Sequence, residues 1–218
     1  MSGGHNEGLG RFIAFEGGEG AGKSTQARML AEALRARGMG VVVTREPGGT
    51  PGAEAIRALL LSPPGAKETG GWPPEAEALL FAAARADHVA RLIRPALARG
   101  DWVICDRFVD SSRAYQGGAG GLGDAAITAL HAVGSDGLRP DRVILLEGDE
   151  GTLASRLAAR GQAADAIEGR GNAYHRAVAA AFRALAEDDP QGFARIDALG
   201  TPDAVHARVL AAIGDLLP

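Results

Sequence analysis

A glycine-rich segment near the start of the chain constrains the fold more than any other feature. Residues 17–24 read Gly-Gly-Glu-Gly-Ala-Gly-Lys-Ser, which fits the pattern of Gly, four residues, Gly, Lys and Ser or Thr. An apolar run at 12–15 precedes this segment, and residues 25–34 are typical of a helix. Because a strand, a loop and a helix in this order are the context of a phosphate-binding loop, we expect the chain to bind a nucleoside triphosphate.

The residue types in this loop suit phosphate chemistry. Glycines let consecutive backbone N–H groups turn toward one phosphate, and the helix N-terminus adds a partial positive charge. The Lys23 ammonium can reach the outer phosphates, and the Ser24 hydroxyl can ligate magnesium. An ordinary glycine-rich turn is the alternative. It leaves the Lys-Ser pair at the start of a helix unexplained, and the chain has only one other lysine, Lys67.

Length and composition limit the number of domains and the class of protein. A chain of 218 residues fits one α/β domain with at most a small lid, and no apolar run is long enough to span a bilayer. The net charge of −4 gives no reason to expect a nucleic-acid or anionic-membrane surface. The lone Cys105 suits a reducing compartment, and residues 1–10 lack the apolar core of a signal peptide. We expect a cytoplasmic protein with a disordered leader at 1–10.

The rest of the chain alternates strand-like and helical segments. Strands are expected at 41–44, 102–105, 142–147 and 193–197, and helices at 52–61, 75–99, near Asp124, at 151–160, 173–187 and after Thr201-Pro202. This alternation predicts an α/β fold with a five-stranded parallel sheet covered by helices on both faces, in a single domain at 11–218. The run at 41–44 is expected to be buried on both faces, and residues 110–121 are expected to form a glycine-rich loop.

Polar residues stand where two of these strands end. Arg45 follows the second strand, and Asp106-Arg107 follows the third. Ligands bind at the carboxyl ends of parallel strands, so Asp106 is a candidate to hold magnesium, directly or through water. Arg107 could neutralise a transferring phosphoryl group, and Arg45 could hold a second phosphate. For Arg45 the alternative is a surface arginine beside an ordinary turn.

The predicted helix at 75–99 has two distinct faces. Its expected core stripe consists of Leu79, Ala83, Ala86, Ala90, Ile93 and Leu97. Phe81, Arg85 and His88 lie on nearly the opposite face, which suggests a ring for stacking and a hydrogen-bonding partner for a planar ligand. The alternative is that Phe81 packs beneath a neighbouring loop and Arg85 is solvated.

A polar segment at about 160–171 has no apolar periodicity and is bracketed by Arg156, Arg160 and Arg170. Such a segment is typical of a mobile lid over phosphate groups. A solvated connection with scattered arginines is the alternative.

Three motifs in this order resemble those of the bacterial thymidylate kinases, within the P-loop nucleoside monophosphate kinase superfamily. They are the loop at 16–25, Thr-Arg-Glu-Pro-Gly-Gly-Thr at 44–50, and Asp-Arg-Phe at 106–108 continuing to Ala-Tyr-Gln-Gly at 114–117. The resemblance covers about 11–217, nearly the whole chain. It implies transfer of phosphoryl from ATP to dTMP with magnesium, giving dTDP and ADP, in a homodimer.

The resemblance also implies roles for individual residues. The ATP phosphates would be held by Gly17, Gly18, Glu19, Gly20, Ala21, Gly22, Lys23, Ser24 and Thr25, with Arg156 also on the ATP side and magnesium at Ser24 and Asp106. For the acceptor, Glu19 would address the sugar 3′-hydroxyl, Arg45 and Arg107 the phosphate, Phe81 the face of thymine, and Arg85, Ser112 and Gln116 its edge. Tyr115 would crowd the 2′ position and so disfavour ribonucleotides.

The sequence departs from the family pattern at the expected position of a catalytic arginine. The phosphate loop contains none, and the lid motif reads Asp-Ala-Ile-Glu at 165–168, with Ala166 where arginine is expected. We hypothesise that Arg160 supplies this charge, with Arg170 as the second candidate. Glu147, where the family usually has aspartate, is given no role.

The sequence bears on three other functions. A kinase for a different nucleoside monophosphate or for a deoxynucleoside would need another base pocket. A guanine-dependent hydrolytic switch would need an Asn-Lys-x-Asp motif, which the sequence lacks. An inactive interaction protein is disfavoured by the intact Lys23, Asp106 and Arg107.

Overall fold

The computed structural model describes residues 10–66, 70–158, 166–167 and 169–218, and its centre is a five-stranded sheet. The strands are β1 (Phe12–Glu16), β2 (Val41–Arg45), β3 (Trp102–Asp106), β4 (Arg142–Glu147) and β5 (Phe193–Asp197). Their order is β2-β3-β1-β4-β5, and every neighbouring pair is parallel. The predicted parallel sheet is therefore confirmed.

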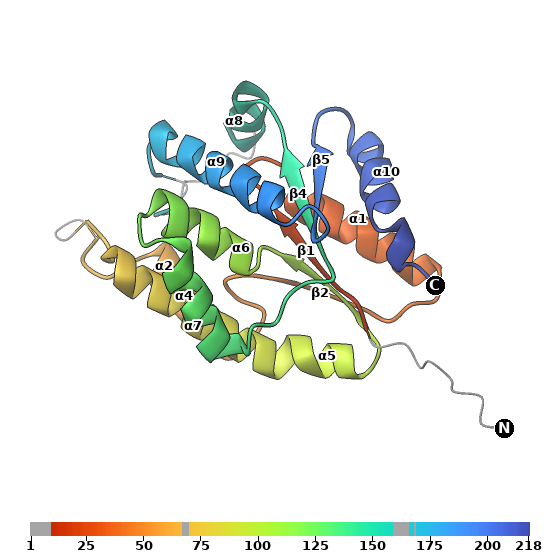
Figure 1. The fold of residues 1–218 in the computed structure, drawn as a ribbon, viewed down its shortest axis with the longest axis horizontal. Helices are drawn as coiled ribbons and strands as arrows, with labels where there is room; N and C mark the ends of the chain where they lie inside the picture. The colour runs from red at the N-terminus through yellow and green to blue at the C-terminus, as the bar shows by residue number, and fades with distance from the viewer. Residues whose placement is uncertain (1–9, 67–69, 159–165, 168) are drawn as a thin grey trace.

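Helices cover both faces of this sheet, as predicted. They are α1 (Lys23–Ala36), α2 (Pro51–Leu61), α4 (Pro74–His88), α5 (Arg94–Ala98), α6 (Val109–Ser112), α7 (Asp124–Ser135), α8 (Glu150–Ala158), α9 (Asn172–Asp188) and α10 (Pro202–Ala212). Two π-helical segments, η1 (Val89–Ile93) and η2 (Arg113–Ala119), and one 3-10 turn, η3 (Gly214–Leu216), complete the set. In Figure 1, α1 and α10 lie on one side of the sheet, and α4, α5, α7 and α9 lie on the other.

Alternate residues of the central strand β1 build the two halves of the core. Ile13 and Phe15 pack with residues of α1 and α10, while Phe12 and Ala14 pack with residues of η1 and α5. This alternation follows from the period of two in a strand. The helix expected after Thr201-Pro202 is capped at its start, because the Thr201 hydroxyl accepts from the backbone N–H of Ala204 at 3.3 Å.

The prediction that the second strand is buried on both faces is wrong. β2 lies at the edge of the sheet and pairs only with β3. Its Val43 side chain is 38% exposed. The β-branched run indicated a strand, but a strand's place in the order depends on contacts with segments far away in the sequence.

The core face predicted for the helix at 75–99 is also wrong over its first half. Leu79 is 56% exposed and Ala83 is exposed, whereas Arg85 and His88 on the other face are buried. The buried charge is tolerated because the Arg85 Nε atom donates to the Glu46 Oε2 atom at 2.7 Å. The π-helical turn η1 then shifts the register, which helps bring the predicted core residue Ile93 inside.

Residues 110–121, expected to form a loop, are largely helical as α6 and η2. Gly118 in η2 serves close packing. A Cβ atom at Gly118 would lie 2.7 Å from the Cβ atom of Ala181 in α9. The glycine content therefore indicates contact between two helices.

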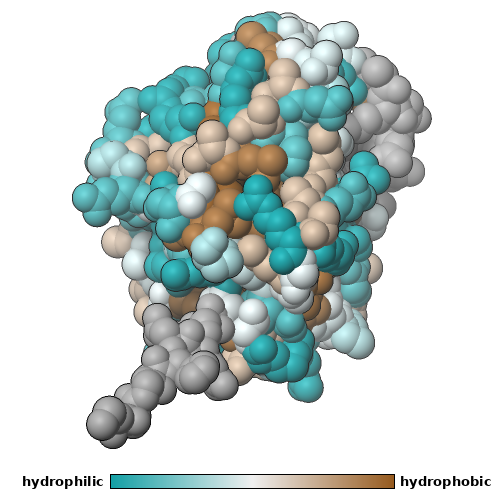
Figure 2. Space-filling view, turned by 90° about the vertical axis from the view of Figure 1, so that its right-hand side faces the viewer, coloured by the Kyte–Doolittle hydropathy of each residue, from teal (hydrophilic) through white to brown (hydrophobic). Residues whose placement is uncertain are grey.

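Figure 2 looks onto the side of the molecule where the C-terminus lies and shows a central apolar patch framed by hydrophilic residues. In the part of the chain that the structure describes, no helix is both long enough and apolar enough to cross a bilayer.

Candidate active site

The phosphate-binding loop turns between the end of β1 and the first residue of α1. Gly17 has a φ of 131°, and a Cβ atom there would lie 2.4 Å from the carbonyl oxygen of Leu146. Only glycine fits this position, because a side chain would collide with the backbone of β4. The loop thus brings its backbone N–H groups to the N-terminus of α1, where an anion is stabilised.

Lys23 lies at the centre of this loop and is only 6% exposed. Its Nζ atom donates to the carbonyl oxygens of Gly17 at 3.1 Å and Gly18 at 2.7 Å. Burial, followed by the nearby Arg107, lowers the pKa of Lys23. The ammonium is therefore fixed where the outer phosphates of a bound nucleotide would lie.

Ser24 and Asp106 form the candidate magnesium position. The Ser24 hydroxyl donates to the Asp106 Oδ2 atom, so the two oxygen ligands already lie side by side. A hydroxyl and a carboxylate are hard oxygen donors, which suit Mg²⁺. No group of three or more His, Cys, Asp or Glu side chains suited to a metal occurs among the described residues. These two groups therefore fit an ion that keeps several water and phosphate ligands.

Arg107 is held in an unusual backbone conformation beside the loop. Its φ is 70°, a region that L-residues rarely occupy. The guanidinium donates to the Gly17 carbonyl at 3.2 Å, to the Ser111 hydroxyl at 3.0 Å and to the Glu19 carboxylate. Burial alone would lower the pKa of Arg107, but the carboxylates around it, Glu19 above all, raise it. The residue is a permanent, oriented cation.

One cavity of about 410 Å³ connects this corner of the site to the predicted base pocket. All the residues predicted to bind the acceptor line it, together with the phosphate-binding lysine and the two magnesium candidates: Glu19, Arg45, Phe81, Arg85, Arg107, Ser112, Tyr115, Gln116, Lys23, Ser24 and Asp106. They come from β2, α4 and η2 as well as from the loop, so the fold joins segments that are far apart in the sequence. Their individual roles stay predictions.

Arg85 and Ser112 lie together at one wall of this cavity. Arg85 is 3% exposed, and its Nη2 atom donates to the Ser112 hydroxyl at 3.0 Å. Glu46 holds the other side of the guanidinium and accepts from it at 2.7 Å. The second Glu46 oxygen lies 3.0 Å from the His88 Nδ1 atom. The arginine is therefore locked in one orientation, as a residue that reads a base edge requires.

Gln116 is connected to the C-terminal end of the predicted lid. Its Nε2 atom donates to the Glu77 Oε1 atom at 2.9 Å, and Arg170 donates to the other Glu77 oxygen. Arg170 also donates to the Tyr174 hydroxyl at 2.6 Å. This second candidate for the lid arginine is thus paired with Glu77, a neighbour of Gln116, and it lines a separate cavity that also includes Gly17, Gly18 and Glu19.

Two other predicted cations are placed differently. Arg156 donates to the carbonyl oxygens of Ala198 at 2.9 Å and Gly200 at 3.4 Å and does not line the cavity. Arg160 lies outside the described residues. Ala166, at the position where the family has arginine, is exposed.

Sequence analysis missed four buried or half-buried polar residues that organise the site: Glu16, Glu46, Glu77 and Ser111. Each bonds to a predicted site residue or to a backbone N–H beside one, and Glu46 and Ser111 also line the cavity. Glu16, Glu46 and Ser111 do stand inside the three motifs at 16–25, 44–50 and 106–117, and this position is the signal that the sequence offers.

A phosphate loop on the central strand, an Asp-Arg pair on the next strand and a cation-lined cavity between them define a P-loop kinase. The fold and site are those of a phosphotransferase of the nucleoside monophosphate kinase class. Comparison with known proteins narrows the class. The family model "Thymidylate kinase" matches residues 15–209.

Relatives agree with this match. The thymidylate kinase of Rhizorhabdus wittichii is 59% identical over 210 residues, covering 96% of this chain and 99% of the relative. That of Bradyrhizobium diazoefficiens is 49% identical over 216 residues, covering 98% and 93%. The crystal structure of thymidylate kinase from Ehrlichia chaffeensis has a TM-score of 0.73 at 30% identity and covers 94% of this chain and 100% of that chain. This chain belongs to the thymidylate kinase family.

Proposed function

We propose that this protein transfers the γ-phosphoryl group of ATP to the 5′-phosphate of dTMP, giving ADP and dTDP. The observation that carries the proposal is the single cavity in which the phosphate loop, the Asp-Arg pair and every predicted acceptor residue meet. A bond from the γ-phosphorus to the bridging oxygen of ADP breaks as one to an acceptor phosphate oxygen forms. That oxygen is already ionised near neutral pH, so no separate general base is required.

In this proposal the chain acts by alignment and by neutralising charge. The loop N–H groups and Lys23 hold the ATP phosphates, while Arg45 and Arg107 hold the acceptor phosphate. Arg45 is suited to this because its side chain is 55% exposed at the cavity and its partner Glu54 is a surface residue that an anion can replace. Arg107 is suited because its orientation is fixed on several sides.

Magnesium belongs to the same proposal. Ser24 and Asp106 would hold it, and when bound it would neutralise charge on the ATP phosphates. The lid at about 160–171 would exclude water from the transfer, with Arg160 adding a cation. We also propose that the protein acts in the cytoplasm, without nucleic acid as a partner.

The direct test is ADP release in a coupled assay with ATP, magnesium and dTMP, dUMP, dCMP, dGMP, UMP or no acceptor. We expect dTMP to be the preferred acceptor, because Arg85, Ser112 and Gln116 converge on one edge of the pocket beside Tyr115. Preference for another nucleotide would support a kinase for that monophosphate. Equal ADP release without any acceptor would support a nucleotide-hydrolysing switch.

We further propose that the protein is a homodimer that pairs through α4 and α7. The exposed apolar side chains on these helices are Leu79, 56% exposed, and Val133, 89% exposed. The two helices are in contact, since a Cβ atom at Gly134 would lie 3.4 Å from the Ala86 Cβ atom. Large apolar side chains exposed on two helices in contact suit an interface between subunits, where they would be removed from water.

Light scattering at micromolar concentration should give twice the chain mass of 22.3 kDa. The substitution Leu79→Glu should shift the protein toward the monomer, because it places a charge in a desolvated interface. Val43→Ser, on the edge strand β2, is the matched control and should leave the mass unchanged. A monomeric mass for the unmodified protein would contradict the dimer.

A further inference from the structure

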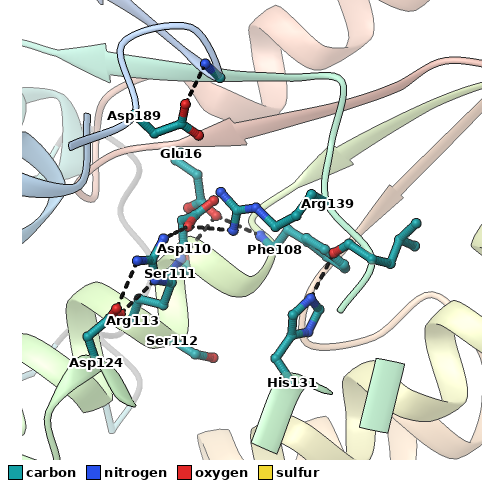
Figure 3. Close-up of polar contacts among 12 residues, drawn as sticks. Glu16, Phe108, Asp110, Ser111, Ser112, Arg113, Asp124, His131, Arg139 and Asp189 are labelled. Carbon is teal, nitrogen blue, oxygen red and sulfur yellow. Dashed lines mark hydrogen bonds and ion pairs between the residues drawn. The ribbon is translucent and has the colours of Figure 1, made fainter. Parts of the chain in front are cut away.

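Glu16, the last residue of β1, directs its carboxylate at the turn that carries Arg107. Its Oε1 atom accepts from the backbone N–H groups of Phe108 at 2.8 Å and Ser111 at 3.0 Å. Its Oε2 atom accepts from the Ser111 hydroxyl at 2.6 Å (Figure 3). Glu16 is 0% exposed and does not line the cavity. It therefore acts on other residues of the site and not on a ligand.

These three hydrogen bonds fix Arg107 from two directions. One ends on the backbone N–H of Phe108, the residue that follows the left-handed φ of Arg107. Another sets the Ser111 hydroxyl, which accepts from the Arg107 Nη1 atom at 3.0 Å. Because Ser111 gives its only proton to Glu16, its lone pairs are left to face the guanidinium. The direction of this chain of bonds requires a carboxylate that accepts.

The surroundings of Glu16 shift its pKa in opposite directions. Burial, then the nearby Asp110, raise the pKa of Glu16 to about 7, while the bonds from Ser111 and Phe108 and the charge of Arg107 act against them. Asp110 is itself 0% exposed and accepts from Arg113 and Arg139, each at 2.9 Å (Figure 3). Lys23 and Cys105 are the other titratable groups on which Glu16 acts.

We propose that Glu16 is a positioning residue for the transfer reaction, and that its ionised carboxylate holds Arg107 on the acceptor phosphate through Ser111 and the Phe108 backbone. This inference rests on the proposed function and adds a residue to it. A structural cap would also accept from the two backbone N–H groups, since they begin α6. Only a positioning residue makes catalysis depend on the charge of Glu16 and on the presence of Ser111.

Glu16→Gln should lower kcat/KM for dTMP by about 10- to 100-fold, because a small misplacement of a phosphate-binding group has effects of that size. The KM for ATP should change little. Ser111→Ala should lower kcat/KM by about tenfold. The double variant should be no slower than Glu16→Gln alone, since both changes break one chain of bonds. Additive losses, or a Glu16→Gln enzyme with wild-type kcat/KM, would overturn the proposal.

The pH dependence of kcat/KM for dTMP provides the second readout, because kcat/KM reports ionisations of the free enzyme. Wild-type kcat/KM should fall as the pH drops through about 7, the pKa of Glu16. This decline should be absent in Glu16→Gln. It should occur at lower pH in Asp110→Asn, because loss of the Asp110 charge favours ionised Glu16. The second ionisation of a phosphate monoester lies near 6 and persists in all three enzymes. A decline at the same pH in both variants as in wild type would overturn the proposal.

Measurements of folding and of substrate binding distinguish a failure of this proposal from a failure of the proposed function. Thermal melts confirm that each variant is folded. Calorimetric binding of dTMP, expected to weaken in Glu16→Gln, needs no turnover. A wild-type protein without dTMP-dependent ADP release would overturn the proposed function, whereas a wild-type enzyme that is active and a Glu16→Gln enzyme that equals it would overturn only the role of Glu16.

Discussion

Replacing Arg107 by alanine is expected to lower turnover with dTMP by about 10²- to 10³-fold, the range for losing one preorganised donor beside the reacting phosphates. Arg107 is one of the three cations in the cavity that we assign to the phosphates. It is the one whose guanidinium is oriented by a carbonyl, a hydroxyl and a carboxylate together. The charge and the direction of its donors are both lost in alanine.

The conservative variant Arg107→Lys separates these two contributions. Lysine keeps the charge but cannot form the fork of parallel N–H donors. We expect its activity to lie between those of the alanine variant and the wild type. Circular dichroism is the necessary control, because alanine inherits the φ of 70° without the contacts that hold it. A folded Arg107→Ala enzyme within tenfold of wild type would contradict the assignment.

Replacing Arg160 by alanine is expected to lower turnover by ~10³ or more, on the scale of an arginine finger. The reason combines sequence and structure. The phosphate loop has no arginine, and alanine stands at the usual lid position, Ala166. The other candidate, Arg170, is paired with Glu77 beside the base pocket. Arg160 is therefore the arginine we assign to the transferring group.

Arg170→Ala and Arg37→Ala are the control variants for the effect of Arg160→Ala. Arg170→Ala should act mainly on the KM for dTMP, because Glu77 bridges Arg170 and Gln116. Arg37 is exposed at the far end of α1, so its replacement should leave both parameters unchanged. Single-turnover measurements would show whether the Arg160 effect lies in the transfer step. A loss of less than about tenfold would remove Arg160 from the mechanism.

The buried carboxylate of Glu16, which holds the turn of Arg107, sets the sign of the pH effect on stability. The pKa of Glu16 is raised in the folded protein, so its contribution to stability is present at low pH and is lost as the pH rises through about 7. The free energy of unfolding should therefore decline from pH 6 to pH 8 more steeply in wild type than in Glu16→Gln. Denaturant titrations at both pH values would measure this difference, and equal slopes would contradict it.

Much of the fold could be predicted from the sequence because its signals are local. The β-branched and apolar runs locate all five strands to within one residue at their ends. Thr201 and Pro202 mark the start of α10 as a capping residue and a first-turn proline should. The loop at 17–24 could be assigned because glycine, lysine and serine each have one function at fixed spacing.

The sequence motifs select residues that line the cavity, but they do not show how these residues are held. The sequence predicts that Phe81 and Arg85 lie on a helix face away from the core. That face is buried because Glu46, from a motif 39 residues away, pairs with Arg85. A hydrophobic stripe cannot reveal this, since a buried charge is tolerated only when a distant partner is in place.

The sequence by itself determined the kind of chemistry. The phosphate loop, the Asp-Arg pair and each strand and helix can be identified from short stretches of neighbouring residues. Only the tertiary structure decided which faces are buried and which polar groups support the site. β2 became an edge strand through its place in the sheet order, and the segment at 110–121 became helical against α9. Glu16 came to hold the turn of Arg107, 91 residues later, because parallel pairing of β1 and β3 brings their carboxyl ends together. Contacts of that kind depend on three-dimensional proximity, which no local pattern of residue types encodes.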